Sequence, residues 1–426
     1  MASNELWDTA KEVIPLGVQT LSKAPWRYVN GVFPKMVISG KGCYMNCADD
    51  PRKYIDYVMG LGPILLGYCF PPIDYNVIHT LTNYGNLFSL EHPFTIILAE
   101  HLRNIIPCAE QVRFCKNGSD ATEGAVRIAR AYSGKYDVAY CGYHGYHDWY
   151  ACEGELNRGI PPQNKQLMHR FTWNNLDSLK TLLMTLPIGT VICEVPPEDS
   201  QEQHGFLKDA IELAHKYDAV FILDEVVTGF RYSMSGAMGL LGVVPDMACF
   251  SKGMGNGYPI AAICGKKEIM QVLGDGAFFS STFAGELVGI SAAIAVIDFM
   301  HRNPVIEHIW KMGDRLRDGM QSVIDDKGLP IKLWGNAPRT IIRCYDKEGK
   351  ESNELKSLFL QEMCKRGVFM GVPTFISYSH TADDIDRTVD AFNGCSDLLV
   401  RAVDEGTDKF MEGDYIDMKG LHRYWK

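Results

Sequence analysis

The chain has 426 residues, of which 46% are hydrophobic and 22% charged, a composition typical of an ordinary folded protein rather than a disordered one. Its formal net charge is −10, which argues against nucleic acid or an anionic membrane surface as the main partner. The 13 cysteines are scattered, no apolar run reaches the roughly 18 residues of a membrane helix, and the start lacks the features of a signal peptide, so we expect a reduced, cytoplasmic protein.

Two kinds of segment alternate through most of the chain. The first sixty residues mix short strand-like pieces, such as Lys35–Ile38, with turns. From there to about residue 310, apolar runs of four to six residues alternate with segments of helical period. Within this region, the run Thr190–Cys193 and the run Ala219–Leu223 flank a segment of helical period and predict a β-α-β unit. The alternation predicts a mostly parallel sheet covered by helices.

The last part of the chain has a different pattern. A helix is predicted from Trp310 to Ile324, a strand around 340–342 and a second helix from Glu354 to Arg366. This order suits a smaller α+β domain. The polar tail after Gly406 receives no assignment.

Ligands of open α/β sheets bind at the carboxyl ends of the strands, so the residues that follow predicted strands are the candidates for function. The run Val112–Cys115 leads through Asn117 to Gly118 and Ser119 and then into a helix that we expect Ser119 or Asp120 to cap. Free N–H groups at such a turn bind phosphate well. Taken alone, the pattern is better explained by a well-capped helix without a ligand.

Two further candidates follow predicted strands. Tyr143 stands just past the run 136–140 and can stack on a flat ring, whereas His144 and His147 lack a third ligand nearby, so we expect no metal site. Asp224 ends a strongly apolar strand, where a carboxylate needs a positive partner. That partner is either Arg231 or a cationic ligand atom, unless Asp224 only caps a helix.

Lys252 completes the set. It ends the run 247–251 and enters a glycine-rich loop, where a planar ligand can approach the backbone. A desolvated lysine is also the amine needed for a Schiff base. It follows Asp224 by 252 − 224 = 28 residues. A phosphate cradle, an aromatic ring, an acid and a lysine are together what pyridoxal 5′-phosphate requires, because the acid keeps the pyridine nitrogen protonated.

The chain resembles the class III pyridoxal-phosphate aminotransferases, and within them the glutamate-1-semialdehyde 2,1-aminomutase branch. The resemblance covers nearly the whole chain and rests on the segments 54–58, 62–63, 117–130, 143–145, 224–231, 251–257 and 379–386. It implies a PLP-dependent transferase of fold type I: an α/β protein with a large mixed, mostly parallel sheet sandwiched by helices and a smaller α+β domain. It also implies a homodimer whose active sites lie at the subunit interface.

The resemblance assigns roles to residues and boundaries to domains. We expect residues 1–60 to be an N-terminal segment packing with the small domain, 61–310 the large PLP-binding domain and 311–426 the C-terminal small domain. By matching motif positions, each cofactor contact has a candidate: Lys252 for the aldimine, Asp224 for the pyridine nitrogen, Val226 and Tyr143 for the two ring faces, Gly118 and Ser119 for the phosphate, and Thr282 for the phosphate of the other subunit. Glu194 matches a glutamate that is usually followed by proline, whereas Val195 follows it here.

Departures from the family concern the substrate. Lys23 stands where the aminomutases carry an arginine for the substrate carboxylate, and Arg27 a few residues on can substitute for it. Leu61 replaces a tryptophan, and Phe283–Glu286 follows Thr282 where the family usually has Gly-Asn-Pro. The cofactor motifs are thus kept while the aminomutase pocket is altered.

We therefore expect an aminotransferase that moves an amino group from an amino donor, through pyridoxamine phosphate, to an aldehyde or ketone acceptor that is polar, sugar-derived compounds being candidates. The alternative is an intramolecular amino shift of the glutamate-1-semialdehyde 2,1-aminomutase type. A racemase or decarboxylase using the same aldimine stays open. A non-catalytic relative is disfavoured by the retained Lys252 and Asp224, and a nicotinamide dehydrogenase by the absence of a G-x-G-x-x-G turn after a strand.

Overall fold

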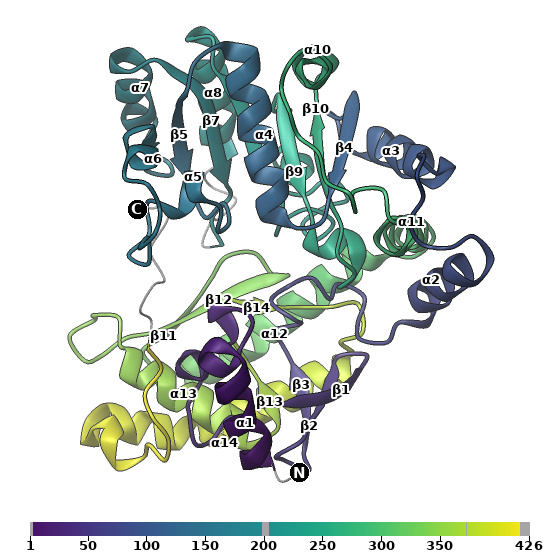
Figure 1. Ribbon diagram of the computed structural model, residues 1–426. Helices are drawn as coiled ribbons and strands as arrows, with labels where there is room; N and C mark the ends of the chain where they lie inside the picture. Colours follow the sequence, from purple (N-terminus) through teal and green to yellow (C-terminus); the bar gives the residue numbers. More distant parts are fainter. Residues whose placement is uncertain (1–2, 198–203, 372, 418–426) are drawn as a thin grey trace. The chain divides into compact units, whose positions relative to one another are not determined.

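The computed structural model describes residues 3–197, 204–371 and 373–417 (Figure 1). Their contacts divide the described chain into two compact units. The central unit runs from Pro71 to Ile306, and the terminal unit combines the described residues up to Phe70 with those from Glu307 on. The described residues from the two end regions of the chain therefore fold together, and the middle of the chain forms a body of its own.

The central unit is built on a seven-stranded sheet (Figure 1). Its order is β4 (Gln111–Cys115), β10 (Ala261–Gly265), β9 (Met247–Phe250), β8 (Val220–Asp224), β7 (Ile188–Glu194), β5 (Asp137–Cys141) and β6 (Met168–Arg170). β10 is antiparallel to both of its neighbours, and the pairs from β9 to β6 are parallel. The expectation of a mixed, mostly parallel sheet is confirmed, and the predicted β-α-β unit is β7, α8 and β8.

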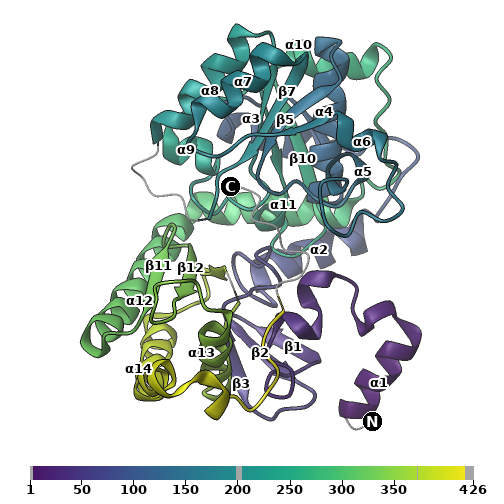
Figure 2. The ribbon, with the colours of Figure 1, turned by 90° about the vertical axis from the view of Figure 1, so that its left-hand side faces the viewer.

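Helices cover both faces of this sheet. Successive strand residues point to opposite sides, and both sides of these strands carry apolar side chains that must be buried. On one face, Val220 and Ile222 share a buried cluster with the apolar stripe of α4 (Gly118–Ser133). The alternate residues Phe221 and Leu223 are just as buried, and α8 (His204–Lys216) contacts the same strand. In Figure 2 the strands β5 and β7 lie between α8 and α4. This double burial explains the continuous apolar runs of the sequence.

The remaining helices of the central unit surround these elements. They are α2 (Pro71–Asn83), α3 (Pro93–Ile105), α5 (Asp148–Ala151), α6 (Gln163–Gln166), α7 (Leu176–Thr185), α9 (Ala237–Leu241), α10 (Lys267–Met270) and α11 (Leu287–Arg302). No helix within the described ranges is both long enough and apolar enough to cross a membrane.

The terminal unit is a smaller α+β body with two sheets. One contains β1 (Val37–Lys41), β2 (Tyr44–Cys47), β3 (Lys53–Asp56) and β13 (Val368–Phe369), and the other β11 (Ile331–Trp334), β12 (Arg339–Cys344) and β14 (Thr374–Phe375). Its helices are α1 (Ser3–Val13), α12 (Val305–Lys327), α13 (Asn353–Lys365) and α14 (Ala382–Glu405). The parallel pair of β3 and β13 joins the two ends of the chain in one sheet.

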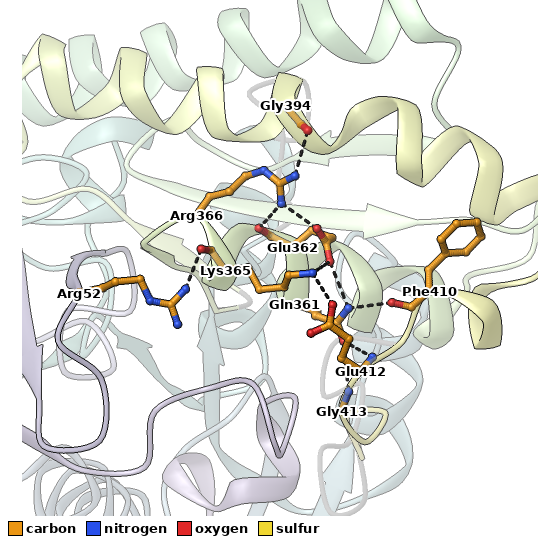
Figure 3. A network of polar contacts seen from close by, with 9 residues as sticks. All are labelled: Arg52, Gln361, Glu362, Lys365, Arg366, Gly394, Phe410, Glu412 and Gly413. Atoms are coloured by element: carbon orange, nitrogen blue, oxygen red, sulfur yellow. Dashed lines mark hydrogen bonds and ion pairs between the residues drawn. The ribbon is translucent and has the colours of Figure 1, made fainter.

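A polar network fixes the tail of the terminal unit, which the sequence left unassigned (Figure 3). Glu362 on α13 is 1% exposed and accepts hydrogen bonds from Arg366 at 2.7 Å and Lys365 at 2.9 Å. Its neighbour Gln361 donates to the carbonyl of Phe410 at 2.9 Å and accepts from the backbone N–H of Glu412 at 2.8 Å. Residues 410–413 are thus held against α13 by side chains that satisfy their backbone groups.

Candidate active site

The site begins at the N-terminus of α4, directly after β4. Asn117 is the cap: its side chain accepts from the N–H of Asp120 at 3.0 Å, and the carboxylate of Asp120 accepts from the N–H of Asn117 at 3.2 Å. The expectation that Ser119 or Asp120 caps this helix is therefore wrong by two or three residues. Asparagine, serine and aspartate are all good caps, so the sequence alone did not separate them.

Because the helix starts at Gly118, Ser119 lies in its first turn, beside the loop that follows β5. The Ser119 hydroxyl accepts from the N–H of Tyr146 at 3.2 Å. A Cβ on Gly145, whose φ is +108°, would lie 2.3 Å from that hydroxyl, and a Cβ on Gly118 would lie 2.7 Å from Val226. Only glycine permits these two approaches. They bring the predicted phosphate pair Gly118 and Ser119 together with Val226.

The carboxyl ends of three parallel strands carry the next residues. Cys141 of β5 pairs in register with Cys193 of β7, and Glu194 with Asp224 of β8. Tyr143, just past β5, is 47% exposed, and its backbone N–H donates to the buried Glu194 carboxylate at 3.4 Å. The structure therefore gathers Tyr143, Glu194 and Asp224 at one edge of the sheet, as their positions after strands predict.

Asp224 is buried, with 3% of its surface exposed. Its carboxylate accepts from the N–H of Val226 at 3.0 Å and contacts Nδ1 of His144 at 2.8 Å. An ionised carboxylate only accepts hydrogen bonds, so Nδ1 is the donor. Two donors from different segments of the chain therefore hold this carboxylate in place.

His144 is a residue whose role the sequence reasoning missed. It is 1% exposed, stacks on Trp149 with a centroid distance of 6.2 Å and meets the edge of Tyr150 at 5.3 Å. Among the described residues its Nε2 has no hydrogen-bond partner. The position of His144 after a strand was a signal, but its partner Asp224 is 80 residues away in the chain. Its contact with Asp224 suits a positioning role.

Lys252 follows β9, the strand next to β8. The preceding residue Ser251 is buried, and its hydroxyl donates to the carbonyl of Ile260 at 2.9 Å. Lys252 opens a 3₁₀ turn (Lys252–Gly255) and has a φ of +40°. A non-glycine residue in this region is strained by roughly 1–3 kcal/mol and persists only where its surroundings hold it, which is common at functional sites.

Three predicted residues lie outside this group. Thr282 is exposed in a turn of the central unit. Lys23 and Arg27 belong to the terminal unit, where Lys23 is exposed and Arg27 donates to the carbonyl of Asp417 at 3.4 Å. Their roles toward phosphate and substrate stay predictions.

The grouped residues fit pyridoxal phosphate. The N-terminus of α4 offers N–H groups and a positive dipole end to a phosphate dianion. The buried Asp224 carboxylate, supported by two donors, suits a protonated ring nitrogen. Lys252, on the neighbouring strand end, supplies a primary amine. The close approach of Gly118 to Val226 brings the residues predicted for the phosphate and for one ring face next to each other.

Comparison with known proteins decides the family. The aminotransferase class-III family model matches residues 29–147 and 190–371. The chain belongs to this family. A 3-aminobutyryl-CoA aminotransferase of Cloacimonas acidaminovorans is 36% identical over 398 residues, covering 91% of this chain and 95% of the relative. A glutamate-1-semialdehyde 2,1-aminomutase of Thermus thermophilus is 31% identical over 427 residues, covering 91% and 98%.

Solved structures agree with this assignment. The FumI protein of Sphingopyxis sp. MTA144, solved in its PLP internal aldimine form, superposes with a TM-score of 0.87 at 25% identity and covers 97% of this chain and 99% of its own. An omega-transaminase from Sphaerobacter thermophilus has a TM-score of 0.84 at 23% identity, covering 94% and 98%, and supports the fold alone. The class III aminotransferase is thus a PLP-dependent enzyme of fold type I, and the resemblance seen in the sequence is confirmed.

Proposed function

We propose that this class III aminotransferase transfers an amino group between two separate substrates, an amino donor and an aldehyde or ketone acceptor. The observation that carries the proposal is the 36% identity, over nine tenths of the chain, to a protein named as an aminotransferase. The replacement of the aminomutase arginine by Lys23, and of the tryptophan before the family's Gly-Pro pair by Leu61, points the same way.

Each residue of the site has a distinct task in this proposal. Bound pyridoxal phosphate withdraws electrons and so stabilises negative charge on the carbon that carries the transferred amino group. Lys252 would hold the cofactor through its Nζ, and the same amine would carry a proton to and from the substrate. Asp224 keeps the ring nitrogen protonated, and His144 orients Asp224. The first turn of α4, with Gly118 and Ser119, holds the phosphate.

The remaining predicted residues shape the pocket. Val226 and Tyr143 flank the two faces of the ring, and Glu194 fixes the backbone of Tyr143 through the 3.4 Å hydrogen bond. Lys23 and Arg27 provide positive charge for an acidic group of the substrate. The name of the Cloacimonas relative supports a β-amino thioester as the amino donor, and the matching β-keto thioester as the acceptor in the reverse direction. For the carbonyl acceptor, the altered pocket also admits the polar, sugar-derived carbonyl compounds expected from the sequence.

The experiment separates donors from acceptors. Purified full-length protein loaded with pyridoxal phosphate is mixed with single amino compounds, without an acceptor, and the visible absorbance of the bound cofactor is followed. Donors that change the spectrum are then combined with a β-keto thioester, a keto acid or a sugar carbonyl compound, and the recovery of the spectrum is measured. We expect at least one donor to act and one acceptor class to restore the spectrum; if no amino compound changes it, the proposal is wrong.

The aminomutase reaction is the second candidate, and the 31% identity to the Thermus thermophilus aminomutase supports it. This reaction needs no second substrate. Turnover of glutamate 1-semialdehyde alone to its isomer would favour it, whereas turnover that requires both a donor and an acceptor favours the aminotransferase.

We also propose that the protein is a cytoplasmic homodimer with shared active sites, acting on small molecules rather than on nucleic acid or membranes. The surface of α2, α3 and the loop between them supports the dimer, because it exposes large apolar side chains that include Tyr75, Ile78, Leu90 and Ile96. Large apolar side chains exposed to solvent in one stretch of the chain are typical of interaction sites. Thr282, exposed in the same unit, is available to a partner's phosphate in such a dimer.

A further inference from the structure

A short ion pair stands beside the candidate cofactor site. Lys116, the residue between β4 and the cap of α4, places its ammonium 2.6 Å from Oε1 of Glu286. Both side chains are largely buried, with 18% and 10% of their surfaces exposed. The same ammonium donates to the carbonyl of Pro259 at 3.3 Å. A charge pair at this depth is screened less than a surface pair, so breaking it leaves a charge poorly solvated.

The pair joins three segments that come from different parts of the chain. The backbone N–H of Lys116 donates to the Asp120 carboxylate of the capping box at 3.2 Å, so Lys116 is tied to the first turn of α4. Glu286 caps α11, where it accepts from the N–H groups of Val288 and Gly289, both at 2.8 Å. Pro259 closes the glycine-rich loop that begins after Lys252.

Close packing makes this junction sensitive to displacement. A Cβ on Gly289 would lie 2.5 Å from the Pro259 carbonyl oxygen, so α11 and the loop are already in contact. The loop is anchored at a second point by Tyr258, whose hydroxyl donates to Asp74 at 2.8 Å. The Pro259 carbonyl and the Lys116 ammonium thus add a side-chain link between the loop and the turn before α4, next to the backbone pair of Ala261 with Cys115.

We infer that Lys116 is a positioning residue: through Glu286 and Pro259, it fixes the phosphate-binding turn of α4 relative to the loop that follows Lys252. The inference rests on the proposed roles of Gly118, Ser119 and Lys252. Pyridoxal phosphate must meet the turn with its phosphate and Lys252 with its aldehyde carbon, so the spacing between the two segments determines how well it binds. Preorganised spacing of this kind raises affinity without a direct contact.

The test measures cofactor affinity rather than turnover. Full-length apoprotein is titrated with pyridoxal phosphate by visible absorbance, and its thermal midpoint is recorded without cofactor. The variants are Lys116→Met, Glu286→Gln and the double variant, with Lys116→Arg as a conservative replacement. The control is Lys266→Met, which removes another 2.6 Å lysine–carboxylate pair, that with Asp246, at the opposite end of β9 and β10.

We expect each single variant of the pair to weaken cofactor binding about tenfold. The double variant should bind the cofactor no more weakly than the single variant with the lower affinity, because the effects of coupled residues do not add. Lys116→Arg should recover most of the affinity, and Lys266→Met should change it less than about twofold even where its thermal midpoint falls.

Two results would overturn the inference. If Lys116→Met weakens binding while Glu286→Gln does not, Lys116 acts directly on the phosphate. If the pair variants lower only the thermal midpoint of the apoprotein, the ion pair is purely structural. The titration needs no amino substrate, so a failure of the proposed transamination would leave this readout intact.

Discussion

The contact between His144 and Asp224 can be tested with two variants of His144, of which the more stable should be the less active. His144→Phe keeps the ring and its packing on Trp149 and Tyr150 but removes the donor to Asp224. His144→Asn keeps an N–H near the position of Nδ1 but removes most of the ring. The two variants therefore separate the hydrogen bond from the packing.

The magnitudes follow from burial. A hydrogen bond to a charged group contributes about 1.5–3 kcal/mol, and the unpartnered Nε2 costs about 1–3 kcal/mol, so in His144→Phe the two effects on stability nearly cancel. If the lost donor weakens the transition state by the same 1.5–3 kcal/mol, kcat/KM falls roughly 10- to 150-fold. His144→Asn leaves a cavity in a buried aromatic cluster and should lose about 2 kcal/mol of stability while it keeps activity within a few-fold of the original.

The assay combines urea unfolding of the apoprotein with kinetics on the donor and acceptor found in the screen. The expected order is that the phenylalanine variant is the more stable and the asparagine variant the more active. Equal kcat/KM for His144→Phe and the unchanged protein would refute the role of the hydrogen bond, and so would an asparagine variant as inactive as the phenylalanine one.

Four further outcomes are expected. Burial raises the pKa of Glu225 from 4.5 to about 7. The protonated carboxyl therefore contributes about 3 kcal/mol to the free energy of unfolding below pH 4.5, and this contribution is lost as the pH rises to 7. Glu225→Gln should remove this slope in urea midpoints. Burial lowers the pKa of His380 from 6.5 to about 4. The neutral imidazole therefore contributes to the free energy of unfolding above pH 6.5, and this contribution is lost as the pH falls toward 4. His380→Gln should remove this slope in urea midpoints. Glu362→Gln should increase hydrogen exchange in the segment 410–413, whereas Glu405→Gln, which breaks only exposed pairs, should not. Leu90→Asp should shift the protein from dimer to monomer in light scattering.

Each of these has a clear contrary result. A pH slope that survives Glu225→Gln or His380→Gln would mean that another group titrates there. Unchanged exchange after Glu362→Gln would show that the hydrogen bonds of Gln361 and packing hold this segment without Glu362. A dimeric Leu90→Asp variant would place the interface elsewhere.

The sheet and the strand-end residues could be predicted because parallel strands buried on both faces produce continuous apolar runs. Such runs end abruptly at a polar residue, and this is how Glu194, Asp224 and Lys252 became visible. The carboxyl ends of neighbouring parallel strands meet at one edge, so the three could be expected to converge there.

Other features depend on contacts between distant segments, which no local pattern encodes. His144 meets Asp224 across 80 residues, and Lys116 meets Glu286 across 170. The polar tail after Gly406 owes its place to Gln361, whose amide satisfies backbone groups of the tail. Sequence periodicity reports which face of an element is buried, but not which distant polar group it meets.

The most direct test of the account is to reduce the holoenzyme with borohydride and map the digested peptides by mass spectrometry. The account predicts that the reduced cofactor is attached to the side chain of Lys252 and to no other lysine. A Lys252 peptide that stays unmodified, while the cofactor is lost or found on another residue, would contradict it.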